Sequence, residues 1–127
     1  MKKSELKLGD WVYAKNPITC EDIPCKIEKF DDDKVLTGLI WSHFDELSPI
    51  PLTEKILKKN GWHNYYDNEL TNPKFAYIHA SFSIDENEWY IMARQDASGD
   101  TFLANIKYVH ELQHILWALK IDDSLSI

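Results

Sequence analysis

The sequence is poor in glycine, cysteine and arginine. It has only four glycines in 127 residues, none next to another, which excludes most of the glycine-rich loops that cradle phosphates. Arg94 is the single arginine, and the formal net charge is −7. Because binding to the nucleic-acid backbone requires clustered Lys and Arg, we do not expect nonspecific nucleic-acid binding. An acidic surface suits a basic partner protein instead.

Long apolar runs are also missing. Ser4 and Glu5 follow the basic start of the chain, and no stretch is long enough to cross a membrane. We therefore expect a cytoplasmic protein with neither a signal peptide nor a membrane span. In a reducing cytosol the two cysteines, Cys20 and Cys25, are expected to be free thiols. A lone pair of this spacing supplies at most half of a zinc site.

The residues that are abundant predict a packed interior. Hydrophobic residues make up 44% of the chain and aromatic residues 13%, more than a disordered chain carries. The length suits one domain, or two subdomains that share a core. Alternation over residues 24–30, a polar turn at 31–34 and a run over 35–41 predict short strands. We expect an N-terminal β subdomain, residues 1–48, built as a small SH3-like β-barrel or curled sheet.

A proline-rich joint from Ser48 to Leu52 leads into the second subdomain, residues 49–127. Its two prolines favour extended backbone. Thr53 is the predicted N-cap of a short helix over residues 54–59, and Asn60-Gly61 is typical of a helix end. The class of fold predicted for the whole chain is α+β, with one folding unit in which both subdomains share a core.

The second subdomain is expected to form an antiparallel sheet covered by a C-terminal helix. Strands are predicted over residues 62–70, 75–84, 89–93 and 101–104, with a loop at 95–100. The helix is predicted over residues 106–120. At 100° per residue its apolar face is formed by Tyr108, Val109, Leu112, Ile115, Leu116 and Leu119, and its solvated flank by Lys107, His110, Glu111 and His114.

The run from His110 to His114 matches H-E-x-x-H. With this spacing two imidazoles bind zinc one helical turn apart, and Glu111 would serve as the general base. A catalytic zinc needs a third protein ligand, however, and the only later acids, Asp122 and Asp123, lie too close on the same helix or its end. We interpret the match as a coincidence and expect no catalytic residue, metal or cofactor.

Three segments carry a resemblance to other proteins: Leu6–Val12, Leu47–Glu54 and Ile106–His114. In their order and spacing, which span nearly the whole chain, the sequence resembles a family of small proteins from gut anaerobic bacteria and their phages and mobile elements. That family usually reads H-Q-L-Q-N where this chain has His110 to His114, and Gln cannot act as a general base. The resemblance implies a fold and a mobile-element context, but no activity and no catalytic residue.

These observations lead to three functional hypotheses. The first is a non-enzymatic interaction protein that binds a protein partner through an acidic and aromatic surface. One concrete form is a phage or mobile-element accessory protein that inhibits a host defence protein by mimicking nucleic-acid charge. The second is a small-ligand or nucleotide-binding module that stacks its ligand on aromatic strands, with Trp62, Tyr65, Tyr66 and Trp89 as candidate residues. The third and least favoured is a zinc hydrolase that uses His110, Glu111 and His114.

Overall fold

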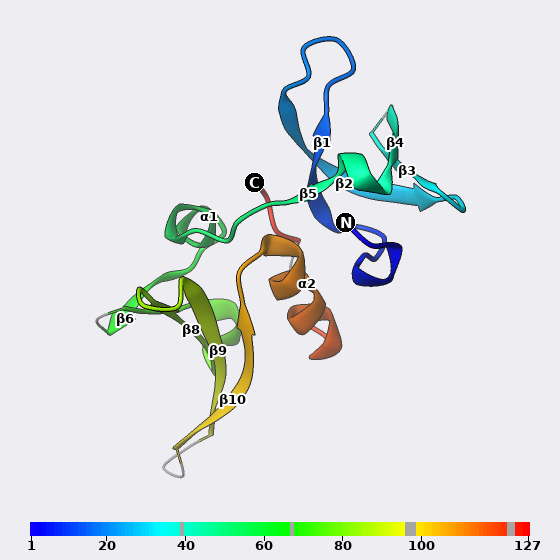
Figure 1. Ribbon diagram of the computed structural model, residues 1–127. Helices are drawn as coiled ribbons and strands as arrows, with labels where there is room; N and C mark the ends of the chain where they lie inside the picture. Colours follow the sequence, from blue (N-terminus) through cyan, green and yellow to red (C-terminus); the bar gives the residue numbers. More distant parts are fainter. Residues whose placement is uncertain (39, 67, 96–98, 122–123) are drawn as a thin grey trace. The chain divides into compact units, whose positions relative to one another are not determined.

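The chain folds into two compact units (Figure 1). The computed structural model describes residues 1–127 except 39, 67, 96–98 and 122–123. Unit 1 contains Met1–Pro51, Tyr108–His114 and Ile127, and unit 2 contains Leu52–Lys107 and Ile115–Ser126. The chain first passes from one unit to the other after Pro51, within the predicted proline-rich joint.

Unit 1 contains an antiparallel five-stranded sheet with the strand order β4-β3-β2-β1-β5. Strands β4 and β5 are its two edges, and the described residues do not close it into a barrel. Its likeness to SH3 domains stays a prediction. The strands are β1 (Trp11–Lys15), β2 (Asp22–Phe30), β3 (Lys34–Thr37), β4 (Ile40–His43) and β5 (Ser48–Pro49).

The single strand expected over residues 35–41 is wrong, because the chain turns back within it. Strands β3 and β4 form a hairpin in which Thr37 pairs with Ile40. Gly38 lies in the turn with a φ of 66°, a backbone conformation that glycine adopts without the strain other residues incur. The alternation that marks a strand says nothing about a reversal of its direction, so this hairpin was missed.

Alternate residues of these strands form the apolar core of unit 1. Val12 and Ala14 of β1 are almost fully buried, as are Ile27 of β2 and Val35 of β3. This inward alternation is the period-2 pattern of a sheet with one covered face. Leu6 and Leu47 complete the buried cluster, and Met1, Cys25, Phe30 and Phe44 pack against it.

The short helix predicted after the joint is confirmed. Helix α1 (Glu54–Lys59) begins after Thr53, whose hydroxyl accepts a hydrogen bond from the Ile56 amide at 3.2 Å. This bond satisfies one of the amides that the first helical turn leaves without a partner. Asn60 is the C-cap of the helix, and Gly61 follows with a φ of 89°, as expected for a glycine after a helix.

Unit 2 contains the second antiparallel sheet, with strands in the order β10-β9-β8-β7-β6. One face of this sheet is apolar, since Leu70, Ala80 and Ile91 lie opposite one another in neighbouring strands and are all buried. The strands are β6 (His63–Tyr66), β7 (Glu69–Thr71), β8 (Ile78–Ser83), β9 (Glu88–Gln95) and β10 (Gly99–Ile106).

The boundaries of all four expected strands need correction. The run over residues 62–70 is divided between β6 and β7, which form a hairpin. The run over 75–84 begins only at Ile78, because Pro73–Phe75 form a 3-10 helix, η3. The strand expected over 101–104 is longer, and part of the loop expected at 95–100 belongs to β9 and β10; residues 96–98 lie outside the described residues.

The C-terminal helix α2 (Val109–Ala118) is shorter than expected, because Ile106 belongs to β10. Val109, Leu112 and Leu116 are fully buried, which confirms the centre of the predicted apolar face. Ile115 is half-buried, and Leu119, beyond the end of the helix, is 38% exposed. The buried side of α2 is therefore rotated away from the predicted one.

This rotation predicts different effects for two leucines near the helix end. Leu116→Ala removes buried methyl groups and leaves a cavity, so it should lower the free energy of unfolding by about 2–5 kcal/mol. Leu119→Ala acts at a partly exposed position and should cost less than about 1 kcal/mol. Urea unfolding followed by circular dichroism measures both. Equal losses would show that the face of α2 has been assigned wrongly.

Candidate functional site

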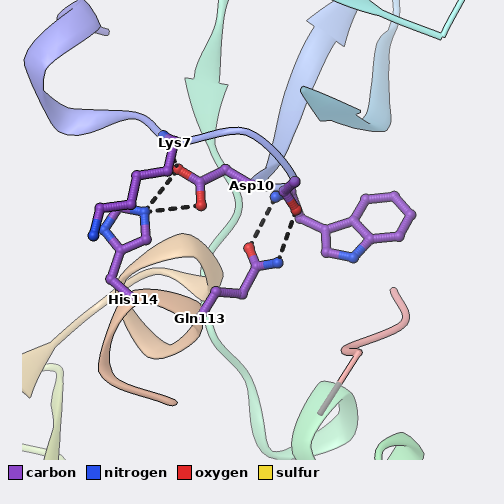
Figure 2. A network of polar contacts seen from close by, with 6 residues as sticks. Lys7, Asp10, Gln113 and His114 are labelled. Carbon is purple, nitrogen blue, oxygen red and sulfur yellow. Dashed lines mark hydrogen bonds and ion pairs between the residues drawn. The ribbon is translucent and has the colours of Figure 1, made fainter. Parts of the chain in front are cut away.

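The H-E-x-x-H segment of α2 lies in a polar network of unit 1, and the solvated flank predicted for its histidines is wrong. Figure 2 shows the ring of His114 directed at the carboxylate of Asp10. The Nε2 atom of His114 lies 2.8 Å from each carboxylate oxygen. Asp10 is fully buried, and the His114 side chain is 24% exposed. In the Nε2–H tautomer, this nitrogen donates a hydrogen bond to the carboxylate.

The turn before β1 holds the carboxylate of Asp10 in place. The backbone amide of Lys7 donates to Asp10 Oδ2 at 2.8 Å. The amide of Gly9, which has a φ of 87°, donates to the Ile27 carbonyl at 2.7 Å. A buried carboxylate is costly unless donors surround it, and His114 and the Lys7 amide supply those donors.

Gln113 binds the backbone on both sides of Asp10. Its amide nitrogen donates to the Gly9 carbonyl at 3.0 Å, and its amide oxygen accepts from the Trp11 amide at 2.9 Å. A primary amide can do both because it carries a donor and an acceptor side by side. Gln113 is 4% exposed, so one buried side chain satisfies both of these backbone groups.

The first two residues of the motif also have structural positions. Glu111 Oε1 accepts from the Tyr108 amide at 3.0 Å, which is the return bond of a capping box at the start of α2. His110 is 4% exposed and stacks on Tyr108 with 6.0 Å between ring centroids. Its Nδ1 has no hydrogen-bond partner among the described residues. Burial, the largest contribution, lowers the pKa of His110.

This arrangement differs from that of a zinc protease. The nitrogen of His114 that would bind zinc is directed at Asp10, and the carboxylate of Glu111 caps its own helix. The described part of the chain contains no group of three His, Cys, Asp or Glu side chains that could hold a metal ion. That the purified protein carries no zinc stays a prediction.

The Asp10 contact predicts that His114 contributes to stability. His114→Ala would leave a buried carboxylate without one donor, which should lower the free energy of unfolding by about 1–3 kcal/mol. His114→Gln is the matched control, because its amide can still donate to the carboxylate. Chemical denaturation should rank wild type and the Gln variant above the Ala variant. An Ala variant as stable as wild type would contradict the structural role.

The lowered pKa of His110 predicts a loss of stability in acid. Unfolded histidine titrates at about pH 6.5, whereas buried His110 takes up its proton only at lower pH. Between these two pKa values the unfolded state binds more protons, so the free energy of unfolding falls as the pH falls. The loss between about pH 7.5 and pH 5.5 should be larger for wild type than for His110→Phe, which cannot titrate. Equal losses would exclude His110 as their source.

The second sheet has a face that remains partly open to solvent. Paired residues of antiparallel strands share a face, so Phe102, Met92 and His79 form one row across β10, β9 and β8. Tyr90 lies in the next row and contacts Phe102 at 6.3 Å between ring centroids. Phe102 is 58% exposed. We call this surface the open face, formed by Tyr65, Glu69, His79, Tyr90, Met92, Arg94 and Phe102.

A charged and aromatic network fixes one end of the open face. The Arg94 guanidinium lies over the Tyr65 ring, 5.2 Å from its centroid, and donates to Asp100 Oδ1 at 3.0 Å. This hydrogen bond is the main cause of the raised pKa of Arg94. Glu69 lies 3.5 Å from Arg94, and its Oε1 is 3.0 Å from Nδ1 of buried His79, at an angle outside hydrogen-bond geometry.

The four aromatic candidates are divided between core and surface. Trp62 is 2% exposed and packs edge-to-face on Phe75, and Trp89 is 3% exposed and donates from Nε1 to the Leu52 carbonyl. Neither ring is accessible to a ligand. Tyr65 and Tyr66 on β6 are 60% and 72% exposed. Only these two could take part in binding through their rings.

Sequence reasoning missed Asp10, Gln113, Arg94 and Phe102. Asp10 and Gln113 lie in Leu6–Val12 and Ile106–His114, two of the segments that carry the resemblance. Nothing in a single sequence shows that these two segments, which the Asp10–His114 contact joins across 104 residues, lie together. The position of Phe102 on the open face follows only from the register of β10 with β9.

Comparison with family models, with curated proteins and with solved structures gives no match. Among the described residues, no helix combines the length and the apolar character that crossing a membrane requires.

Proposed function

We propose that the protein is a non-enzymatic interaction protein that binds a partner protein through the open face of unit 2. The observation behind the proposal is the exposure of aromatic rings from separate strands on one sheet face, with Tyr65 60% and Phe102 58% exposed. Exposed aromatic surface of this kind is typical of interaction sites.

The types of residue on the open face support a protein partner. Tyr, Phe, Met and Arg are enriched in protein interfaces, and Tyr90, Met92, Arg94 and Phe102 supply all four within β9 and β10. The single arginine and the net charge of −7 give nucleic acid little to bind. A partner with basic groups around an apolar centre fits this charge.

The contacts around Arg94 support binding without a large loss of entropy. Tyr65 contacts both the guanidinium of Arg94 and the ring of His79, which it meets edge-on with 5.4 Å between centroids. Side chains that are ordered before binding lose less conformational freedom in the complex. The open face therefore presents the Tyr65 ring in a defined position.

The positions of the H-E-x-x-H residues favour a role other than catalysis. Glu111 caps α2, and His114 is bonded to a buried carboxylate. A general base must be free to reach the proton that it removes from a substrate. The non-enzymatic part of the proposal rests on these contacts.

Photo-crosslinking tests the open face directly. A photoreactive phenylalanine analogue at position 102 should yield a discrete cross-linked protein in lysate of the source cells, because this position is exposed on the open face. Tyr65→Ser in the same chain should reduce the yield by about fivefold or more, as expected for the loss of a hot-spot ring.

The matched control places the same analogue at Leu8, an apolar position of unit 1 that is 57% exposed. It should not yield the same product. A product that forms equally from both positions, or that survives Tyr65→Ser unchanged, would contradict binding through the open face.

A further inference from the structure

A cavity of about 510 Å³ lies in unit 1, outside both the Asp10 network and the open face. A volume of this size is within the range of known ligand sites. One wall is formed by β4 and the nearby Glu46, and the other by the end of β1 and the turn that follows it. The lining residues are Lys15, Asn16, Pro17, Cys20, Ile40, Trp41, Ser42 and Glu46.

The cavity runs along the free edge of a strand. Ile40, Trp41 and Ser42 are consecutive in β4, and consecutive side chains of a strand point to opposite faces. All three can border one cavity only if it lies beside the strand rather than above or below it. Strand β4 pairs with β3 alone among the described strands, so its other edge presents backbone N–H and C=O groups without strand partners.

The lining of the cavity combines apolar side chains with an acidic one. Trp41 is 49% exposed, and Pro17 and Ile40 line the cavity with it. The charge of Lys15 is already balanced by Asp22, 2.7 Å away. Glu46 accepts a hydrogen bond from the His43 amide through Oε1, and its carboxylate keeps further acceptor capacity.

Two exposed carboxylates are chain neighbours of residues that line the cavity. Asp45 is next to Glu46 in the chain, and Glu21 follows Cys20; both are exposed. A ligand that lies along β4 therefore meets apolar side chains and an excess of negative charge.

We propose that this cavity binds an extended segment of a partner protein, which adds a strand to the free edge of β4. Backbone hydrogen bonds to β4 would hold the segment, as in other complexes formed by strand addition. Its side chains alternate between apolar residues against Trp41 and basic residues toward Glu46. This site is independent of the open face, because it belongs to unit 1.

The test uses the full chain and a defined probe, a short capped peptide of alternating lysine and valine. Nuclear magnetic resonance should show shifts of the Ile40, Trp41 and Ser42 amides on titration with this peptide. The same peptide with glutamate in place of lysine should not bind. A version with N-methylated valines, which keeps charge and apolar groups but loses N–H donors, should bind at least about fivefold more weakly.

Two variants separate the contributions of the walls. Trp41→Ser removes the exposed ring, and Glu46→Gln removes the charge while it keeps the acceptor for the His43 amide. Each should weaken binding by about fivefold or more. Tyr66→Ser, at an exposed position of unit 2, is the matched control and should leave the affinity unchanged.

Three results would each overturn the β4 site: no binding of the lysine peptide, equal binding of the glutamate peptide, or shifts confined to unit 2. None of these results would affect the cross-linking expected at Phe102. The two proposals can therefore fail separately.

Discussion

A carboxylate that is removed from water must be surrounded by donors, because its desolvation costs several kcal/mol. In unit 1 the carboxylate that needs such donors is that of Asp10, which has no exposed surface. Its donors are the Lys7 amide from its own turn and the ring of His114, 104 residues later in the chain. The start of β1 and the first turns of α2 therefore belong to the same compact unit, although almost the whole sequence lies between them.

The same requirement explains why a metal-binding pattern can occur without metal chemistry. In H-E-x-x-H the spacing places two histidines on one side of a helix, and any buried acid nearby benefits from a donor at that position. Here Asp10 takes that donor from His114, while Glu111 is used at the start of its helix. The H-E-x-x-H spacing indicates which side chains share a helix face, but the contacts of those side chains determine their role.

Features set by neighbours in sequence could be predicted, whereas features set by distant partners could not. Thr53 precedes α1 and Gly61 follows it, as expected, because capping depends on a few adjacent residues. The helix wheel found buried Leu112 and Leu116, but it counted only apolar side chains and so assigned buried His110 to the solvated flank. The open face depends on strand register, which a single sequence does not encode locally.

The two proposed binding surfaces use the sheets in different ways, one through exposed side chains and the other through a strand edge. Both require folded units, and in unit 1 that fold relies on the contact between Asp10 and His114. A double-mutant cycle with Asp10→Ala and His114→Ala measures this contact most directly. We predict a coupling free energy of about 1–3 kcal/mol in chemical denaturation. Strictly additive losses from the two substitutions would contradict the account.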